Sequence, residues 1–452
     1  MTGIPLIIAF VIAIVAMILL ISKLKVHPFL ATMGISLILA IVAGIPLKDI
    51  PSVIGAGFSG TFSSIGIVII LGAFIGSVLE KTGAALKLAD MIINLVGERN
   101  PELAMELMGW VVSIPVFCDS GFVILNPIRK ALVRRTGKSS VAMTVCLSCG
   151  LYIAHVFIPP TPGPIAAAQT LGAGEHLLLV IGFGVLCSIF PLIAGYLYAR
   201  FIGKKIKSAD ELGGNDEVVK TYEELKAEYG KLPGGFNALA PLIIPILLMG
   251  LSSVSSMAGW TGGFADLLTF LGTPIMALAV GAILAIIQLF TANKSEDFYN
   301  LTNETLKTVG PILFVTAAGG VLGKVISSSD MVNFITEHAA VLQTLGIFFP
   351  FLLSAILKSA QGSSTVAITT TAGIVSPLLA VLGYTTPAQI ALVVMAIGAG
   401  AMTVSHANDS YFWVVTNFGE MKPEEGYRTQ TLMTLVIGIA AMVEIFILSL
   451  FI

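Results

Sequence analysis

Apolar stretches of about 20 residues recur along almost the whole sequence, and this pattern limits the possible folds more than any other feature. About 20 apolar residues in a helix cross the hydrocarbon core of a bilayer, which is roughly 30 Å thick. Hydrophobic residues make up 56% of the chain and charged residues 11%, so an ordinary soluble domain is excluded. The sequence therefore predicts an all-α, polytopic membrane protein. Its predicted spans are 4–22, 28–47, 61–79, 139–171, 177–200, 236–256, 266–290, 308–326, 386–418 and 431–452.

Two further apolar windows are interrupted near their middle by small polar residues. The window at about 103–130 contains CDSG at 118–121, and the window at about 340–382 contains KSAQGSST at 358–365. Backbone that leaves helical geometry at membrane depth is tolerated only where protein buries it or where it lines a wet cavity. We therefore expect these windows to form two re-entrant helical hairpins, one in each half of the chain.

Basic residues gather in loops that lie on one side of the membrane if the N-terminus is outside. The loops at 172–176, 257–265 and 383–387 contain no lysine or arginine. Because cytoplasmic loops are enriched in both residues, the pattern predicts that the N- and C-termini are extracytoplasmic. The predicted cytoplasmic residues are Lys23, Lys25, Arg129, Lys130, Arg134, Arg135, Lys138, Arg200, Lys204, Lys205, Lys207, Lys294, Lys307, Lys422 and Arg428.

The hydrophilic segment 201–235 divides the chain into two similar parts, 1–200 and 236–452. LGAFIGSVLEKTG at 71–83 resembles AGGVLGKVISSSD at 318–330. Each half is predicted to contain about five spans and one hairpin, so the second half would begin on the opposite side of the membrane. We therefore expect an inverted repeat whose halves are joined by a cytoplasmic linker.

Two of the predicted spans are expected to break near the middle of the membrane. HVFIPPTPGP at 155–164 interrupts the span at 139–171, because proline cannot continue a helix. SHANDS at 405–410 interrupts the span at 386–418. In transporters with inverted repeats, broken helices form the substrate and ion sites near the midplane. We expect the two hairpin tips and the two breaks to meet at one central site.

Carboxylates and histidines at these places are candidates for carrying a proton. Asp119, at the first hairpin tip, marks an ion or proton path, or else it caps the helix that follows. Asp409 and His406 form a candidate proton-carrying pair, or a hydrogen-bonded brace for the broken helix. His155 lies at the equivalent break of the first half, without a carboxylate nearby in the sequence. The candidates for proton coupling are therefore Asp119, His155, His406 and Asp409.

Polar residues around the second tip suit a carboxylate ligand. Hydroxyls, an amide and free backbone N–H groups at a helix start bind such a group, although hydroxyls in membrane helices also bond to the preceding turn. Lys358 is a counter-ion for an anionic substrate or for Asp119, or else a member of a structural ion pair. The candidate substrate-binding residues are Ser120, Thr161, Lys358, Gln361, Gly362, Ser363, Ser364, Thr365 and Asn408.

Three segments resemble a known family. VHPFLATMGISLILAIVAGIPL at 26–47, AQGSSTVA at 360–367 and SHANDSYFW at 405–413 are similar to the gluconate:proton symporter family of bacterial inner-membrane permeases. The resemblance implies transport of gluconate, other sugar acids, glycerate or D-serine with protons. It also implies a fold of the wider ion-transporter superfamily, which is often dimeric.

Site residues carried over from this resemblance lie in the second half of the chain. FCDSGFVILNPI at 117–128 and HVFIPPTPGPIAAA at 155–168 depart from the better-known gluconate carriers and indicate a distinct branch. The substrate is therefore open between gluconate and a short hydroxy acid such as glycerate. The implicated residues are Lys358, Gln361, Gly362, Ser363, Thr365, His406, Asn408 and Asp409.

We therefore expect secondary active import of a small hydroxy-monocarboxylate with a proton, by alternating access across a bacterial inner membrane. Sodium coupling through hairpin-tip carbonyls, Ser120 and Asn408 is the alternative. A cation/proton antiporter is disfavoured by the hydroxyl cluster at 361–365, and an ion-independent channel suits two hairpins and broken helices less well.

Other functional classes lack support in the sequence. There is no nucleophile and base pair or HExxH motif that would indicate an enzyme, and nothing indicates a cofactor. The four cysteines lie in apolar segments without a set of metal ligands around them. The net charge of −2, without a basic tail, gives no reason to expect a nucleic acid partner.

Overall fold

The computed structural model describes residues 4–96, 100–211, 227, 230, 232–257, 259–330, 345–406 and 409–452, and much of the predicted linker lies outside this part. Regular structure in the described residues is helical throughout. This agrees with the predicted all-helical, multi-span membrane protein. The helical segments long and apolar enough to cross a membrane are Ser140–Thr170, Gly174–Ile202, Gly235–Ser252, Pro274–Thr291, Ser295–Ser327 and Pro423–Ser449.

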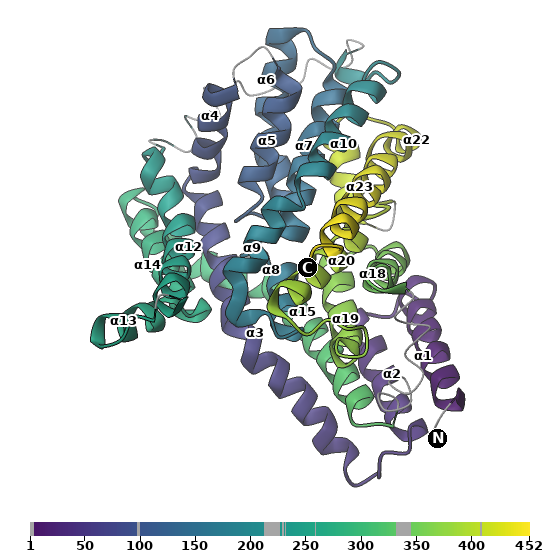
Figure 1. The fold of residues 1–452 in the computed structure, drawn as a ribbon. Coiled ribbons are helices and arrows are strands. Elements are labelled where there is room, and N and C mark those ends of the chain that lie inside the picture. Colours follow the sequence, from purple (N-terminus) through teal and green to yellow (C-terminus); the bar gives the residue numbers. More distant parts are fainter. Residues whose placement is uncertain are drawn as a thin grey trace.

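Helices of the first half, shown in purple to teal in Figure 1, precede the linker. They are α1 (Ile4–Ser22), α2 (Pro28–Val42), α3 (Ile50–Lys81), α4 (Ala84–Val96), α5 (Pro101–Val112), α6 (Cys118–Thr136), α7 (Ser140–Phe157), α8 (Pro162–Thr170), α9 (Leu177–Leu186) and α10 (Ile189–Ile202).

Helices of the second half, shown in teal to yellow, follow the linker. They are α12 (Gly235–Met257), α13 (Gly263–Gly272), α14 (Pro274–Thr291), α15 (Phe298–Ser327), α18 (Phe348–Gln361), α19 (Ser364–Val375), α20 (Pro387–Met402), α21 (Ser410–Phe418), α22 (Pro423–Gly426) and α23 (Leu432–Ser449).

Some helix boundaries differ from the predicted spans. The span predicted at 266–290 is two helices, α13 and α14, because Thr273 is extended before Pro274 and the residue before a proline is disfavoured in helical geometry. The span predicted at 61–79 is part of the longer α3, which begins at Ile50. The short helix α4 was not predicted, since its polar residues keep it out of a hydropathy window.

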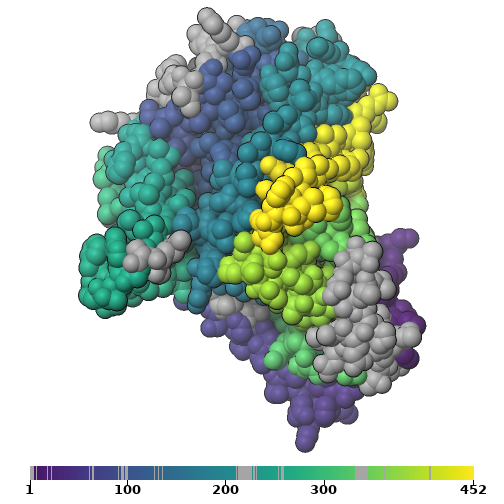
Figure 2. Space-filling view, viewed as in Figure 1, coloured from purple at the N-terminus to yellow at the C-terminus, as the bar shows by residue number. Residues whose placement is uncertain are grey.

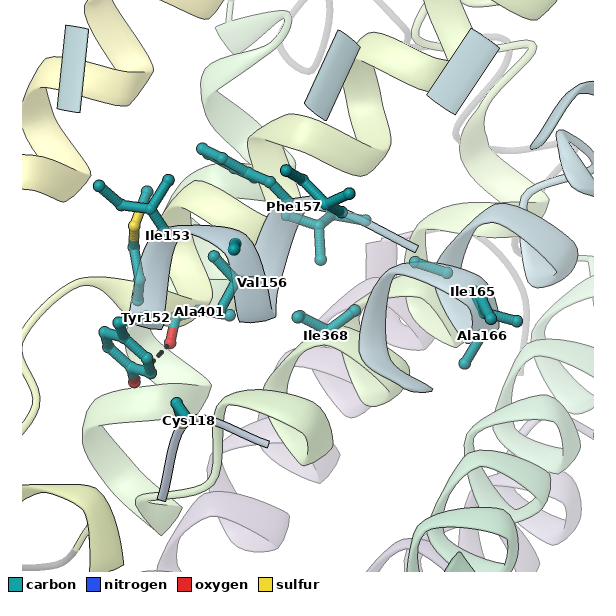
Figure 3. Close-up of a cluster of buried hydrophobic side chains, with 14 of the residues drawn as sticks. Cys118, Tyr152, Ile153, Val156, Phe157, Ile165, Ala166, Ile368 and Ala401 are labelled. Atoms are coloured by element: carbon teal, nitrogen blue, oxygen red, sulfur yellow. Dashed lines mark hydrogen bonds between the residues drawn. The ribbon is translucent and has the colours of Figure 1, made fainter. Parts of the chain in front are cut away.

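The centre of the molecule is built on α7, all of whose side chains are buried. It packs against α5, α6, α10 and α20, which surround it in Figure 1. Gly150 allows the closest of these contacts, since a Cβ there would lie 1.9 Å from the carbonyl oxygen of Glu106 in α5. Figure 3 shows the apolar cluster beside α7, where the hydroxyl of Tyr152 donates to the carbonyl of Ala401 over 3.5 Å.

The C-terminal helix α23 lies along α10 on the face shown in Figure 2. Glu444 of α23 is buried, and one of its carboxylate oxygens accepts a hydrogen bond of 3.0 Å from the backbone N–H of Phe190. Phe190 belongs to the first turn of α10, where N–H groups have no acceptor within the helix. The Glu444 side chain therefore provides a hydrogen-bond acceptor for an N–H group at the start of α10, inside the apolar region.

Four breaks between consecutive helices lie at or near the predicted hairpin tips and broken spans. Residues 113–117 connect α5 to α6, and residues 362–363 connect α18 to α19. Residues 158–161 separate α7 from α8, and residues 403–409 separate α20 from α21, with 407–408 outside the described part. The CDSG sequence is the first turn of α6, so the chain turns just before it. The inverted relation between the two halves stays a prediction.

Candidate functional site

A cavity of about 280 Å³ lies where three helices begin. The first residues of α6, α19 and α21 line it, and Tyr152 and His155 of α7 complete its wall. These helices come from both sides of the linker, so residues far apart in the sequence share one cavity. The residues that line it are Phe117, Cys118, Asp119, Tyr152, His155, Gly362, Ser363, Ser364, Thr365, Asp409, Ser410 and Tyr411.

The start of α19 is suited to an anion. Gly362 has φ of 91°, a left-handed conformation that glycine adopts readily, and it ends α18 so that α19 begins two residues later. The hydroxyl of Ser363 accepts from the N–H of Val366 over 3.3 Å. The N–H groups of Ser364 and Thr365 belong to the same first turn, where a helix offers no acceptor and carries partial positive charge.

Lys358 and Asp409 form a buried ion pair at the wall of the cavity, which Asp409 lines. The lysine Nζ lies 2.6 Å from Oδ2 of Asp409, and the two side chains are only 1% and 6% exposed. Nζ also donates to the carbonyl of Gly362. Asp409 accepts further hydrogen bonds from the Ser405 hydroxyl at 2.5 Å and from the Tyr411 N–H at 3.1 Å. The ion pair therefore joins the turn between α18 and α19 to the start of α21.

This arrangement shows which partner Lys358 has in the structure. Its partner is Asp409 and not Asp119, and it is absent from the described residues that line the cavity. An ammonium and a carboxylate that are buried together compensate each other's lost hydration. The structural ion pair considered from the sequence is the arrangement seen here.

Asp119 is the acidic group that faces the cavity without a basic partner among the described residues. One carboxylate oxygen accepts from the hydroxyl of Ser410 over 3.3 Å, and the other lies 3.7 Å from the thiol of Cys118. Since Ser410 begins α21, the contact joins the first half of the chain to the second. An unpaired carboxylate in such a place is costly when charged.

The two candidate histidines lie apart. His155 is 5% exposed, its Nδ1 has no hydrogen-bond partner in the described part of the chain, and its ring centre lies 6.0 Å from that of Phe117. His406 places Nε2 3.0 Å from the carbonyl oxygen of Ser359, on α18. The predicted pairing of the His406 and Asp409 side chains is not seen, because each contacts α18 instead, His406 at Ser359 and Asp409 at Lys358.

The remaining predicted site residues fall into three groups. Gly362, Ser363, Ser364 and Thr365 line the cavity. Ser120 lines a different, larger cavity, and the hydroxyl of Thr161 donates to the carbonyl of Ile158 over 2.7 Å instead of lining either one. Asn408 and the side chain of Gln361 lie outside the described residues.

Aromatic residues of the cavity were missed as site residues by sequence reasoning. The rings of Tyr152 and Tyr411 lie 5.1 Å apart, and the Tyr411 hydroxyl donates to the carbonyl of Ser148 over 3.1 Å. Tyr152 could have been found by its spacing, since it lies three residues before His155 and therefore on the same face of a helix. Phe117 gives no such signal, because whether it lines the cavity depends on which residues pack against the connection between α5 and α6.

Comparison with known proteins places the chain in a family. Residues 4–451 match the profile of the GntP family permeases. An inner membrane permease of Escherichia coli, YgbN, is 32% identical over 432 residues, covering 94% of each chain. A gluconate permease of Zymomonas mobilis is 28% identical over 440 residues, covering 96% of this chain and 95% of its own.

A solved structure shares the fold. MtrF of Neisseria gonorrhoeae, described as one of a class of antimetabolite efflux pumps, superposes with a TM-score of 0.70 at 15% identity. The superposition covers 95% of this chain and 96% of MtrF. The predicted resemblance to the gluconate:proton symporter family is thus confirmed, and the chain belongs to the GntP family of permeases, membrane transport proteins and not enzymes.

Proposed function

We propose that this permease imports a small hydroxy-monocarboxylate, such as gluconate or glycerate, together with a proton. The observation that carries the proposal is a cavity that combines helix N-termini, hydroxyl groups and one carboxylate without a basic partner among the described residues. The gluconate permease of Zymomonas mobilis supports the class of substrate, because it is similar over almost the whole chain.

The substrate carboxylate would bind at the start of α19. Backbone N–H groups and the helix dipole attract an anion there, and the hydroxyls of Ser364 and Thr365 add donors. Hydroxyl groups of the acid would then face Ser410 and the ring edges of Tyr152 and Tyr411. The cavity of about 280 Å³ is slightly smaller than typical ligand pockets, which span roughly 300–1,000 Å³. A short acid suits this volume best.

The coupling proton would bind Asp119. An anionic substrate and an ionised Asp119 repel each other strongly in a cavity of low dielectric constant. Protonation of Asp119 removes this repulsion, so the proton and the anion favour each other's binding. Asp409 is less suited to the role, because Lys358 already compensates its charge.

The location and orientation of the protein are part of the same proposal. The permease lies in a bacterial inner membrane, as does the similar inner membrane permease YgbN of Escherichia coli. The basic loops face the cytoplasm, both termini face outward, and the two halves form an inverted repeat around the cavity.

Uptake into liposomes tests the proposal. Purified protein would be reconstituted, and uptake of radiolabelled D-glycerate and gluconate measured with an inward proton gradient or, separately, an inward sodium gradient. Accumulation of one acid under the proton gradient alone is the expected result. Accumulation only with sodium would overturn proton coupling, and absence of uptake of both acids under either gradient would overturn the substrate class.

A further inference from the structure

A second, larger cavity of about 700 Å³ lies beside the candidate site, and we name it the vestibule. Polar and charged side chains at the end of α3 and the start of α15 form most of its wall. Lys81 and Asp297 pair across it over 3.2 Å, and both side chains are 42% exposed, so the vestibule reaches solvent. Its other residues are Ser77, Glu80, Phe117, Ser120, Lys294, Leu301, Glu304, Thr305 and Thr308.

Phe117 is the one described residue that lines both the vestibule and the site cavity. It is the residue before α6, and its half-buried ring lies against His155 at 6.0 Å between ring centres. The residues that follow divide between the two spaces, since Cys118 and Asp119 line the site cavity and Ser120 lines the vestibule. Phe117 therefore stands at the boundary between the cavity that contains Asp119 and the vestibule.

The site cavity is separated from a third cavity by packed helices. This third cavity, of about 310 Å³ and lined by Gln169, Thr170 and Ser376 among others, shares no described residue with the site cavity. Between them α8 packs closely on α19, where a Cβ on Gly163 would lie 2.9 Å from the side chain of Ile368. Opening that route would require α8 and α19 to separate, whereas the boundary at Phe117 is a single residue whose side chain can change rotamer without the movement of a helix.

We infer that Phe117 is the seal between the vestibule and the substrate site, and that the site opens to the vestibule when this ring swings aside. The inference depends on the chain being a transporter, but not on which acid or ion it carries. The vestibule lies beside Lys81 and Lys294, near the ends of helices that the distribution of basic residues assigns to the cytoplasm. Phe117 is therefore the cytoplasmic seal.

Cys118 is a natural reporter for this seal. It is 2% exposed, it lines the site cavity, and it follows Phe117 directly. Thiol reagents attack only where they can reach the sulfur, so its reaction rate measures access to the cavity. The other three cysteines are fully buried and line none of these cavities, and each is replaced by alanine so that only Cys118 can react.

The experiment compares Phe117→Ala with matched variants in the protein that retains only Cys118. Modification by a membrane-impermeant methanethiosulfonate would be followed by mass spectrometry in inside-out and right-side-out vesicles. Phe117→Ala should raise the rate by about tenfold or more in inside-out vesicles, and Phe117→Trp should keep it low. Leu301→Ala, which removes an apolar vestibule residue outside the site cavity, should leave it unchanged.

Three results would overturn the inference. They are an unchanged rate in Phe117→Ala, an equal increase in Leu301→Ala, and faster reaction from the opposite side of the membrane. Thermal unfolding of each variant shows whether a rate change reflects general loosening of the fold. The modification of Cys118 is measured without substrate. A failure of the liposome uptake would therefore not contradict the role of Phe117, and a failure of the modification experiment would not contradict the proposed substrate or coupling ion.

Discussion

Asp119 and Asp409 line the same cavity, but their surroundings differ and so should the effects of replacing them. Asp119 accepts from a hydroxyl and forms no ion pair among the described residues, whereas Asp409 is paired with buried Lys358. A carboxylate that is free to bind a proton is expected to serve coupling. A carboxylate held by an ammonium is expected to serve the structure of the site.

Asp119→Asn should abolish accumulation driven by the proton gradient and retain exchange of substrate. Asparagine keeps the shape and can accept from Ser410, but it cannot take up a proton. Gradient-driven uptake and counterflow in liposomes separate the two activities. Asp297→Asn, which removes a carboxylate of the vestibule instead, should retain both. Full proton-driven uptake by Asp119→Asn would show that another group carries the proton.

Asp409→Asn should destabilise the protein by about 3–5 kcal/mol, because it leaves the Lys358 ammonium buried without its counter-ion. The exposed pair Lys307–Glu304 has the same separation of 2.6 Å, with side chains 72% and 67% exposed. Glu304→Gln is the matched control and should change stability by less than about 1 kcal/mol. Chemical unfolding of the purified variants in detergent measures both, and equal losses would contradict this view of the buried pair.

At the scale of elements, the turn between α18 and α19 depends on a glycine. Gly362 at φ of 91° lets α18 end and α19 begin with its N-terminus on the cavity. A side chain in this region of backbone conformation costs roughly 1–2 kcal/mol. The interruption is therefore both a structural requirement and the means by which the anion site is positioned.

Gly362→Ala should raise the KM for the transported acid as well as lower stability, because the start of α19 would shift. Gly383 provides the control, since it has φ of 86°, lies outside the cavity and has open space where a Cβ would be built. Gly383→Ala should lose similar stability with an unchanged KM. Uptake kinetics and thermal unfolding of both variants check this, and an unchanged KM in Gly362→Ala would show that α19 does not hold the substrate.

At the scale of the whole molecule, the parts of the chain before and after the linker meet where the C-terminal half of α6 contacts the end of α21 and the residues that follow it. Buried Arg129 donates to the carbonyl of Phe418 over 3.2 Å, and Lys130 forms an ion pair with Glu420. Together with the contact between Asp119 and Ser410, these bonds connect the part of the chain before the linker to the part after it.

Symport of one proton with one monoanion makes a prediction for the whole transport cycle. Such uptake carries no net charge, so an imposed membrane potential should leave accumulation unchanged, whereas lowering the external pH should increase it. A second proton would instead add about 2.3 kcal/mol per 100 mV. Uptake at fixed pH gradients, with potentials set by potassium and valinomycin, distinguishes the two stoichiometries. Accumulation that grows with an inside-negative potential would exclude the electroneutral cycle.

The sequence by itself determined the class of the protein and the neighbourhoods, though not the exact residues, at which its helices are interrupted. The length of each apolar stretch shows which segments can cross a bilayer. The polar residues near 118–121, 358–365 and 405–410 are conspicuous because they lie within such stretches. These signals can be read from the sequence because they depend on neighbouring residues, as when a proline ends the helix in which it lies. Boundaries such as that between α13 and α14 were missed, since one extended residue at Thr273 hardly changes an apolar window.

Only the tertiary structure decided which polar groups meet. Lys358 bonds Asp409, 51 positions away, and His406 bonds Ser359 although it lies three residues from Asp409. Phe117 became a candidate seal only because the vestibule and the site cavity lie on either side of it. A side chain's partner depends on how each helix is rotated and packed against distant helices, and that rotation follows from the packing of the whole molecule, not from the local order of residues.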